Sequence, residues 1–330
     1  EPGDVLVVRA TSPAFNAVLA IAGAVVTGNG GAMSHAAVLA RELGIPAVVG
    51  AGAALDIADG STVEGDLLVA ADGIYSAVRA QFEPSCQAVY AGYSAWRGLV
   101  PESAFSMEFR REIFEQLAFC LPPGEQCLGY PVAGEANDMR AGFRRYNIVW
   151  YRPAEKQTEL QRLLTDIDGH SNGISIAPHR IRQDVIDDMR SDAKRLLAPQ
   201  FADAVLKAEA PFIQPIYDLS VSRMVYDRVA IIGDAAFVAR PHVGMGVTKA
   251  ADDAKALVEC ITAHDGIDAA LTAYQAQRHP IGQHVVSHAR TLGCYLGDIS
   301  DKSDEEKRLA EVYRQPAAVV YETASPDFLK

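Results

Sequence analysis

Short apolar runs and helical spacings alternate along the first fifty residues. Runs flanked by glycine or charged residues, typical of buried strands, occupy 4–10, 23–28 and 45–50. Between them, 12–22 and 33–43 carry Ala and Leu at helical spacing. Strands that alternate with helices predict an α/β fold with a parallel or mixed sheet.

The pattern changes after residue 65. Strands are expected at 66–71, 90–100, 127–134 and 145–153, helices at 184–197 and 199–208, then a buried strand within 227–236 and a helix over 246–262. Polar and aromatic alternation in the middle strands predicts an antiparallel sheet. Before Tyr75 the only aromatic residue is Phe15, and the first lysine is Lys156. We therefore expect a chain of the α/β plus α+β class with two domains, residues 1–63 and 64–330, the first of β/α type and the second with an antiparallel sheet.

Composition excludes several classes of function. The chain has 330 residues, 49% of them hydrophobic, and a net charge of −12 without a Lys/Arg stripe, so a globular protein without a nucleic-acid partner is expected. The longest apolar run, 17–26, is too short to span a bilayer, and no basic leader precedes it, so we expect no membrane association and a cytoplasmic location. Five widely spaced cysteines suggest neither a zinc site nor a disulfide framework.

A glycine-rich turn before the helix at 33–43 is the first candidate site. Gly30 and Gly31 permit close approach of a ligand, and a helix start favours an anion. His35 in the first helical turn could carry a phosphoryl group at nitrogen. The alternative is an ordinary turn capped by Ser34 with a surface histidine. A dinucleotide fingerprint fails, because Met33 stands where the third glycine would be.

The runs "GGAMSHA" and "ARELGIPAVVG", with "TSP" at 11–13, resemble the swivelling phosphohistidine domain of phosphoenolpyruvate-utilising enzymes. The resemblance spans about residues 2–63. It implies that His35 is the carrier histidine that moves phosphate between a nucleotide site and a phosphoenolpyruvate or acceptor site. Neither partner domain is recognisable in the rest of the chain.

Two Asp/Gly pairs follow predicted strands in the larger region. Asp72-Gly73 precedes a helix that carries Arg79, and Gly233-Asp234 follows the strand in 227–236. A carboxylate at a strand end is well placed to accept hydrogen bonds from ribose or ribityl hydroxyls. The alternative in each case is a simple turn. Further glycines follow a proline before the next helix, at Pro241, Gly244 and Gly246.

In this order the two pairs resemble the second and third FAD fingerprints of aromatic-ring flavin monooxygenases. "YAGYSAWRGLVP", "QPIYDLSVSRM" and "GDAAFVARPH" are most similar to the pyridine-hydroxylase branch. The resemblance implies that NAD(P)H reduces bound FAD, which then uses O2 to hydroxylate a small aromatic ring. The cofactor-binding residues it implies are Asp72, Gly73, Arg79, Gly233, Asp234, Pro241, Gly244 and Gly246.

Within that resemblance, Asp234 binds the ribityl chain, and Gly244–Gly246 lie against the isoalloxazine ring. Asp72 serves the FAD and the nicotinamide passage. His242 and Tyr217 are candidate substrate-pocket residues, with ordinary packing as the alternative. His284 and His288 stand four residues apart without a third acidic ligand, so no metal is expected. A homodimer is expected by analogy.

The βαβ unit with G-x-G-x-x-G, which opens such monooxygenases, has no counterpart in this sequence. We therefore expect the strand in 227–236 to lack its sheet neighbours. The adenosine part of FAD is expected to lack its binding surface. The hypotheses at this point are a flavin monooxygenase of reduced competence, a phosphotransfer module built on His35, and a chimeric chain without activity.

Overall fold

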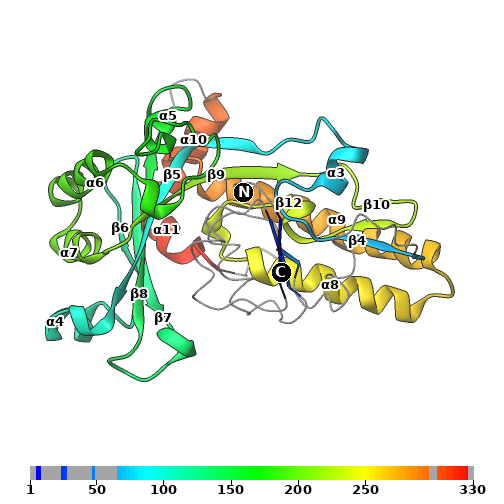
Figure 1. Cartoon of the computed structure of the whole chain (residues 1–330), viewed down its shortest axis with the longest axis horizontal. Coiled ribbons are helices and arrows are strands. Elements are labelled where there is room, and N and C mark those ends of the chain that lie inside the picture. The colour runs from blue at the N-terminus through cyan, green and yellow to red at the C-terminus, as the bar shows by residue number, and fades with distance from the viewer. Residues whose placement is uncertain (1–4, 9–23, 28–46, 49–64, 297–302, 326–330) are drawn as a thin grey trace. The chain divides into compact units, whose positions relative to one another are not determined.

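The computed structural model describes residues 5–8, 24–27, 47–48, 65–296 and 303–325 (Figure 1). The chain divides into two compact units. The first comprises 1–89, 217–290 and 323–330, and the second comprises 90–216 and 291–322.

Three short parallel strands lie near the N-terminus: β1 (Val5–Val8), β2 (Ala24–Thr27) and β3 (Ala47–Val48), paired in the order β1-β2-β3. The strand predictions for this region and the parallel pairing are confirmed. The helices expected at 12–22 and 33–43, together with Gly30, Gly31, Ser34 and His35, lie outside the described residues.

A second small sheet of the first unit has the order β10-β11-β4, from β10 (Val225–Tyr226), β11 (Val229–Ile231) and β4 (Leu68–Ala70). β11 pairs antiparallel with β10 and parallel with β4. The expectation that this strand would lose its neighbours was therefore wrong, because β4 and the hairpin strand β10 both pair with it. Among the described strands β4 pairs only with β11, and Leu68 is 51% exposed.

Helices α8 (Gly246–Ala263) and α9 (Ile267–Leu292) supply much of the apolar core of the first unit. Leu257 of α8 and Tyr274 of α9 pack in one cluster with Ile231 of β11 and Phe237 of β12 (Phe237–Val238). The short helix α3 (Ala77–Phe82) begins at Ser76, whose hydroxyl accepts from the Arg79 N–H. The described part of this unit from residue 65 onward is thus a small α/β layer packed around this cluster.

The described strands of the second unit form the antiparallel sheet that the sequence predicted. Its order is β9-β5-β8-β7-β6, and β9 continues into the first unit, where it pairs with β12. The strands are β5 (Val89–Pro101), β6 (Ala118–Cys120), β7 (Gln126–Val132), β8 (Arg145–Pro153) and β9 (Phe212–Ser220).

Helices cover this sheet, α6 (Gln183–Leu196) and α7 (Pro199–Lys207) lying to one side of it in Figure 1. The other cluster of sheet residues, which includes Tyr151, packs with residues of α10 (Asp304–Tyr313) and α11 (Pro316–Glu322). The remaining described helices are α4 (Met107–Glu112), α5 (Glu159–Leu164) and the 3-10 turns η2 (Glu102–Ala104), η3 (Glu135–Asn137), η4 (Pro178–Arg180), η5 (Gly233–Ala235) and η6 (Pro241–Val243).

No helix in the described part of the chain is both long and apolar enough to span a bilayer.

Candidate functional site

The two Asp/Gly pairs lie side by side at the carboxyl ends of neighbouring parallel strands. Ala70 of β4 is in register with Ile231 of β11, and the Ala70 carbonyl accepts from the Ile232 N–H at 2.9 Å. Asp72-Gly73 follows the first strand and Gly233-Asp234 follows the second. Loops at this edge of a parallel sheet are where α/β folds place their ligands. Two motifs 160 residues apart in the chain thus belong to one region.

Arg79 joins the two loops directly. Its Nη1 donates to the Ala235 carbonyl at 2.8 Å, and its Nη2 donates to the Ile74 carbonyl. The side chain is buried, and burial lowers the pKa of Arg79 from its ordinary value. The residue expected to bind cofactor therefore positions both loops by holding their backbone carbonyls.

Asp72 has one carboxylate oxygen engaged and one available. Its Oδ2 accepts from the Val78 N–H at 3.2 Å, which fixes the side chain over the start of α3. Its Oδ1 is buried and has no hydrogen-bond partner among the residues that the structure describes. Because a buried acceptor is normally satisfied, this oxygen fits a ligand hydroxyl or amide.

Three buried charged side chains fix the Gly233-Asp234 turn. Gly233 has φ +62°, a conformation that favours glycine, and its N–H donates to Asp253 Oδ2 at 3.1 Å. The Lys249 ammonium donates to the Gly233 carbonyl at 2.9 Å, and Arg278 Nε donates to Asp253 Oδ1 at 2.8 Å. The backbone of the turn is thus held at both its donor and its acceptor.

Sequence reasoning missed these three residues. Lys249 and Asp253 stand four apart on α8, a spacing that signals an ion pair but not its burial, and Arg278 lies on α9. Lys249 is 2% exposed, so burial lowers its pKa, while the nearby carboxylates of Asp234 and Asp253 act in the opposite direction. Asp234 itself is exposed, so its carboxylate can reach a ligand.

The start of α8 lies next to this turn, and the first N–H groups of a helix have no partner within the helix itself. Its N-cap, Met245, makes no side-chain cap, and the first turn holds no acidic residue. Pro241, Gly244 and Gly246 are exposed. Gly244 has φ +65°, and a Cβ there would lie 2.9 Å from the Ala324 Cβ. Gly244 is thus required by the close approach of Ala324, while the start of α8 favours negative charge near it.

His242 and Tyr217, the two candidate substrate-pocket residues, have different surroundings. His242 is buried in η6, where burial and then Arg240 lower its pKa to about 3, so the imidazole is neutral at neutral pH. Tyr217 is half-buried, and burial raises its pKa. Burial and then Tyr217 raise the pKa of Tyr75, in the loop that follows Asp72-Gly73, to about 12.

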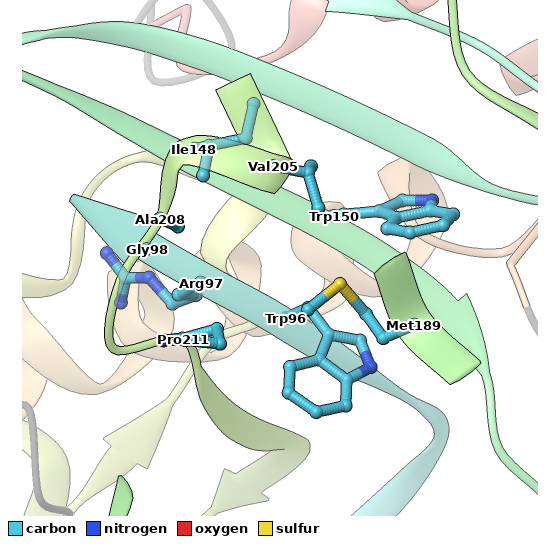
Figure 2. Close-up of a pocket in the computed structure, with 9 residues that line it drawn as sticks. All are labelled: Trp96, Arg97, Gly98, Ile148, Trp150, Met189, Val205, Ala208 and Pro211. Carbon is cyan, nitrogen blue, oxygen red and sulfur yellow. The ribbon is translucent and has the colours of Figure 1, made fainter. Parts of the chain in front are cut away.

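A small hollow lies elsewhere, between the antiparallel sheet and its helices (Figure 2). Trp96 and Trp150 from the sheet, Met189 of α6 and Val205 of α7 line it, with Arg97 at one side. None of the residues expected to bind flavin or substrate is among those that line it. It is a gap in the apolar core of the second unit.

One described group of side chains has the composition of a metal site: Asp166, Asp168 and His170. Arg180 Nη2 donates to both carboxylates, at 2.7 Å to Asp166 and 2.6 Å to Asp168. The hydrogen bonds hold the pKa of Asp166 well below its usual range although burial opposes this. The guanidinium already supplies the positive charge that a metal ion would bring.

Comparison with protein families finds two matches on different parts of the chain. Residues 90–218 match the FAD binding domain-like family, and residues 1–69 match the mobile domain of PEP-utilising enzymes. Over most of the chain the similarity is to FAD-dependent monooxygenases, and the N-terminal part is similar to the mobile domain of PEP-utilising enzymes. Both resemblances seen in the sequence are confirmed, whereas the boundary between residues 63 and 64 stays a prediction.

Among individual relatives, the chain is 31% identical over 248 residues to 2,6-dihydroxypyridine 3-monooxygenase of Paenarthrobacter nicotinovorans, covering 72% of this chain and 59% of that enzyme. The solved 2,6-dihydroxypyridine-3-hydroxylase from Arthrobacter nicotinovorans superposes with a TM-score of 0.68 at 28% identity, over 75% of this chain and 62% of that one. Phosphoenolpyruvate synthase of Escherichia coli is 53% identical over 64 residues, 19% of this chain and 8% of the synthase. The chain spans between 44% and 59% of the length of these curated monooxygenases.

Removing the Asp253 carboxylate is expected to destabilise the first unit strongly. Asp253→Ala leaves Lys249 and Arg278 buried without their counter-charge, which costs about 3–5 kcal/mol in the free energy of unfolding. Urea unfolding followed by circular dichroism measures it. Asp252→Ala, at the half-buried neighbouring position on α8, is the control and should cost less than about 1 kcal/mol. Equal losses in the two variants would contradict the role given to Asp253.

His242 is expected to make stability fall as the pH is lowered. The folded-state pKa of about 3 lies below the ordinary value of 6.5, so between these values only the unfolded state takes up the proton. The stability is therefore complete above about pH 6.5 and is lost progressively below it, by up to ~1.4 kcal/mol per pH unit. Between about pH 6 and 5, unfolding free energies of the native protein should fall more steeply than those of His242→Gln. Parallel slopes would show that His242 is not buried in its neutral form.

Proposed function

We propose that the larger part of this chain binds the flavin end of FAD and hydroxylates a small aromatic or N-heteroaromatic ring with NAD(P)H and O2. The observation that supports it most is the Arg79 side chain, which holds the Asp72 and Gly233 loops together at one edge of the β4–β11 pair. The similarity to hydroxypyridine and other aromatic monooxygenases supports the reaction class. A homodimer stays a prediction from the resemblance.

The residues fit the flavin half of the cofactor. Asp234 accepts from ribityl hydroxyls, the buried Asp72 Oδ1 accepts from a further polar group, and the N–H groups at the start of α8 favour negative charge on the reduced ring. Bound flavin supplies the redox chemistry with oxygen. The chain orients the aromatic substrate, for which Tyr217 and neutral His242 are the proposed pocket residues. For the adenosine half the sequence holds no G-x-G-x-x-G run.

Loss of the Asp234 carboxylate should weaken FAD binding without unfolding the protein. A charged acceptor of this kind contributes about 1.5–3 kcal/mol, so Asp234→Ala should raise the Kd about ten- to a hundredfold. Quenching of flavin fluorescence during titration of the full chain measures the Kd. Asp265→Ala removes an exposed carboxylate from the same unit and serves as the control. An unchanged Kd in Asp234→Ala, or no saturable binding to the native protein, would refute the proposal.

A second function has independent support at the N-terminus. Residues 1–69 match the mobile domain of PEP-utilising enzymes, and "GGAMSHA" puts His35 at the position of the family's carrier histidine. We propose that His35 accepts a phosphoryl group at a ring nitrogen. The donor is a phosphoenolpyruvate or nucleotide site outside residues 1–330, because none is recognisable within them.

Phosphate should appear on His35 when a phosphoenolpyruvate synthase core lacking its own mobile domain is added with labelled phosphoenolpyruvate. The label should be lost on mild acid treatment, as expected of a phosphoramidate, and should be absent from His35→Ala. His170→Ala, which removes an exposed histidine of the second unit, should leave labelling unchanged. Labelling that persists in His35→Ala would rule out the carrier role. The absence of labelling in the native chain would rule it out as well.

A further inference from the structure

Two cysteines face each other across the hairpin of β6 and β7. Cys120 is the last residue of β6, and the antiparallel register pairs it with Cys127 of β7. Residues directly opposite in such a pair project from the same face of the sheet. Both thiols are free, and Cys120 packs against the apolar cluster that contains Cys127. The two cysteines stand seven residues apart in the sequence, and that spacing alone does not predict that they face each other.

The hydrogen-bond alternation of the sheet fixes what kind of pair this is. The Ala154 N–H donates to the Gly92 carbonyl at 3.1 Å, so these two opposite residues are a hydrogen-bonded pair. Hydrogen-bonded and non-hydrogen-bonded pairs alternate along two antiparallel strands, so Trp96 and Trp150, four pairs further along, are hydrogen-bonded as well. The backbone groups of Trp150 therefore point away from β7.

Since Cys127 is opposite Trp150, its own backbone groups must point to β6. Cys120 and Cys127 are then a hydrogen-bonded pair, with Cα atoms about 5.5 Å apart. A disulfide spans Cα separations of about 4.4–6.8 Å. The two thiols are thus close enough to bridge once the strands shift slightly, because the Cβ atoms of a hydrogen-bonded pair lie up to about 5.5 Å apart and a disulfide draws them to about 3.5–4.5 Å.

The two thiols differ in access. Cys127 is fully buried, and burial raises its pKa. Cys120 is half-buried on a strand at the end of the sheet order, and its sulfur accepts from the Ala198 N–H at 3.4 Å, where α7 begins. An incoming reagent can therefore reach Cys120 first, with Cys127 behind it to complete the bridge.

We propose that Cys120 and Cys127 are a reversible redox pair, which closes to a cross-strand disulfide on reaction with a low-molecular-weight disulfide such as oxidised glutathione. The Cys120 thiol loses its proton to solvent, and its sulfur attacks one sulfur of the reagent, so that the first small thiolate leaves. Cys127 then loses its proton and attacks the Cys120 sulfur, and the second small thiolate leaves. The protein thiols give up two electrons and two protons, and the reagent becomes two thiols.

Both tryptophans of the chain lie in the same cross-strand row. Cys127 is opposite Trp150, and Trp150 is opposite Trp96. Figure 2 shows the two indoles lining one hollow, and Trp150 Nε1 donates to Glu125 of the hairpin loop at 2.7 Å. A disulfide next to an excited indole accepts an electron from it and quenches its fluorescence. Tryptophan emission therefore reports closure of the pair.

The test uses the full chain, first reduced and then incubated with oxidised glutathione. We expect the intact mass to fall by two hydrogen atoms, peptide mapping to link Cys120 to Cys127, and tryptophan emission to drop. Dithiothreitol should reverse all three changes. Cys120→Ser, at the half-buried position, should abolish the link and the drop in emission.

Cys86→Ser is the matched control, because Cys86 is also half-buried but lies in the first unit, and this variant should respond like the native chain. Cys127→Ala should retain glutathione on Cys120 as a stable mixed disulfide. If this core variant folds poorly, peptide mapping of the native chain still tests the proposal. The proposal is overturned if the native chain keeps glutathione on Cys120 without closing. It is equally overturned if the link forms only in urea or joins other cysteines.

Discussion

The carboxylate of Asp253 is the constraint on which the described part of the first unit depends. It lies buried between the Gly233 N–H, the Arg278 guanidinium and the Lys249 ammonium. Buried charges are tolerated only when they are paired and hydrogen-bonded, so each partner requires the others. Because these partners come from the turn, α8 and α9, the single carboxylate fixes where the turn after β11 lies relative to both helices.

The candidate site follows from that constraint. Once the Gly233-Asp234 turn is fixed, its Ala235 carbonyl receives Arg79, and Arg79 in turn holds the loop after Asp72. Among the residues that the structure describes at this edge, the groups placed to meet a ligand are the Asp234 carboxylate, the buried Asp72 Oδ1 and the start of α8. They suit the flavin and ribityl part of FAD, and the similarity to aromatic monooxygenases agrees with this reading.

The sequence predicted elements well where local pattern decides them and poorly where distant residues do. Strand alternation predicted β5, β7 and β8, and Asp/Gly pairs after strands predicted both loops. The 26-residue helix α9 was not foreseen, because Pro280 inside it is usually a sign that a helix ends. Arg278 and Arg79 reach partners 25 and 156 residues away, which no local pattern encodes.

Hydrogen exchange of backbone amides, measured with and without FAD, shows whether the loops after β4 and β11 bind the flavin. Amides that bind a ligand, or that a ligand covers, exchange more slowly. If the two loops form the flavin site, FAD will slow exchange in residues 72–79, in Gly233–Ala235 and in the first turn of α8, while the β6–β7 hairpin is unchanged. Unchanged exchange in these three segments at saturating FAD, or slowing confined to the second unit, would contradict the account.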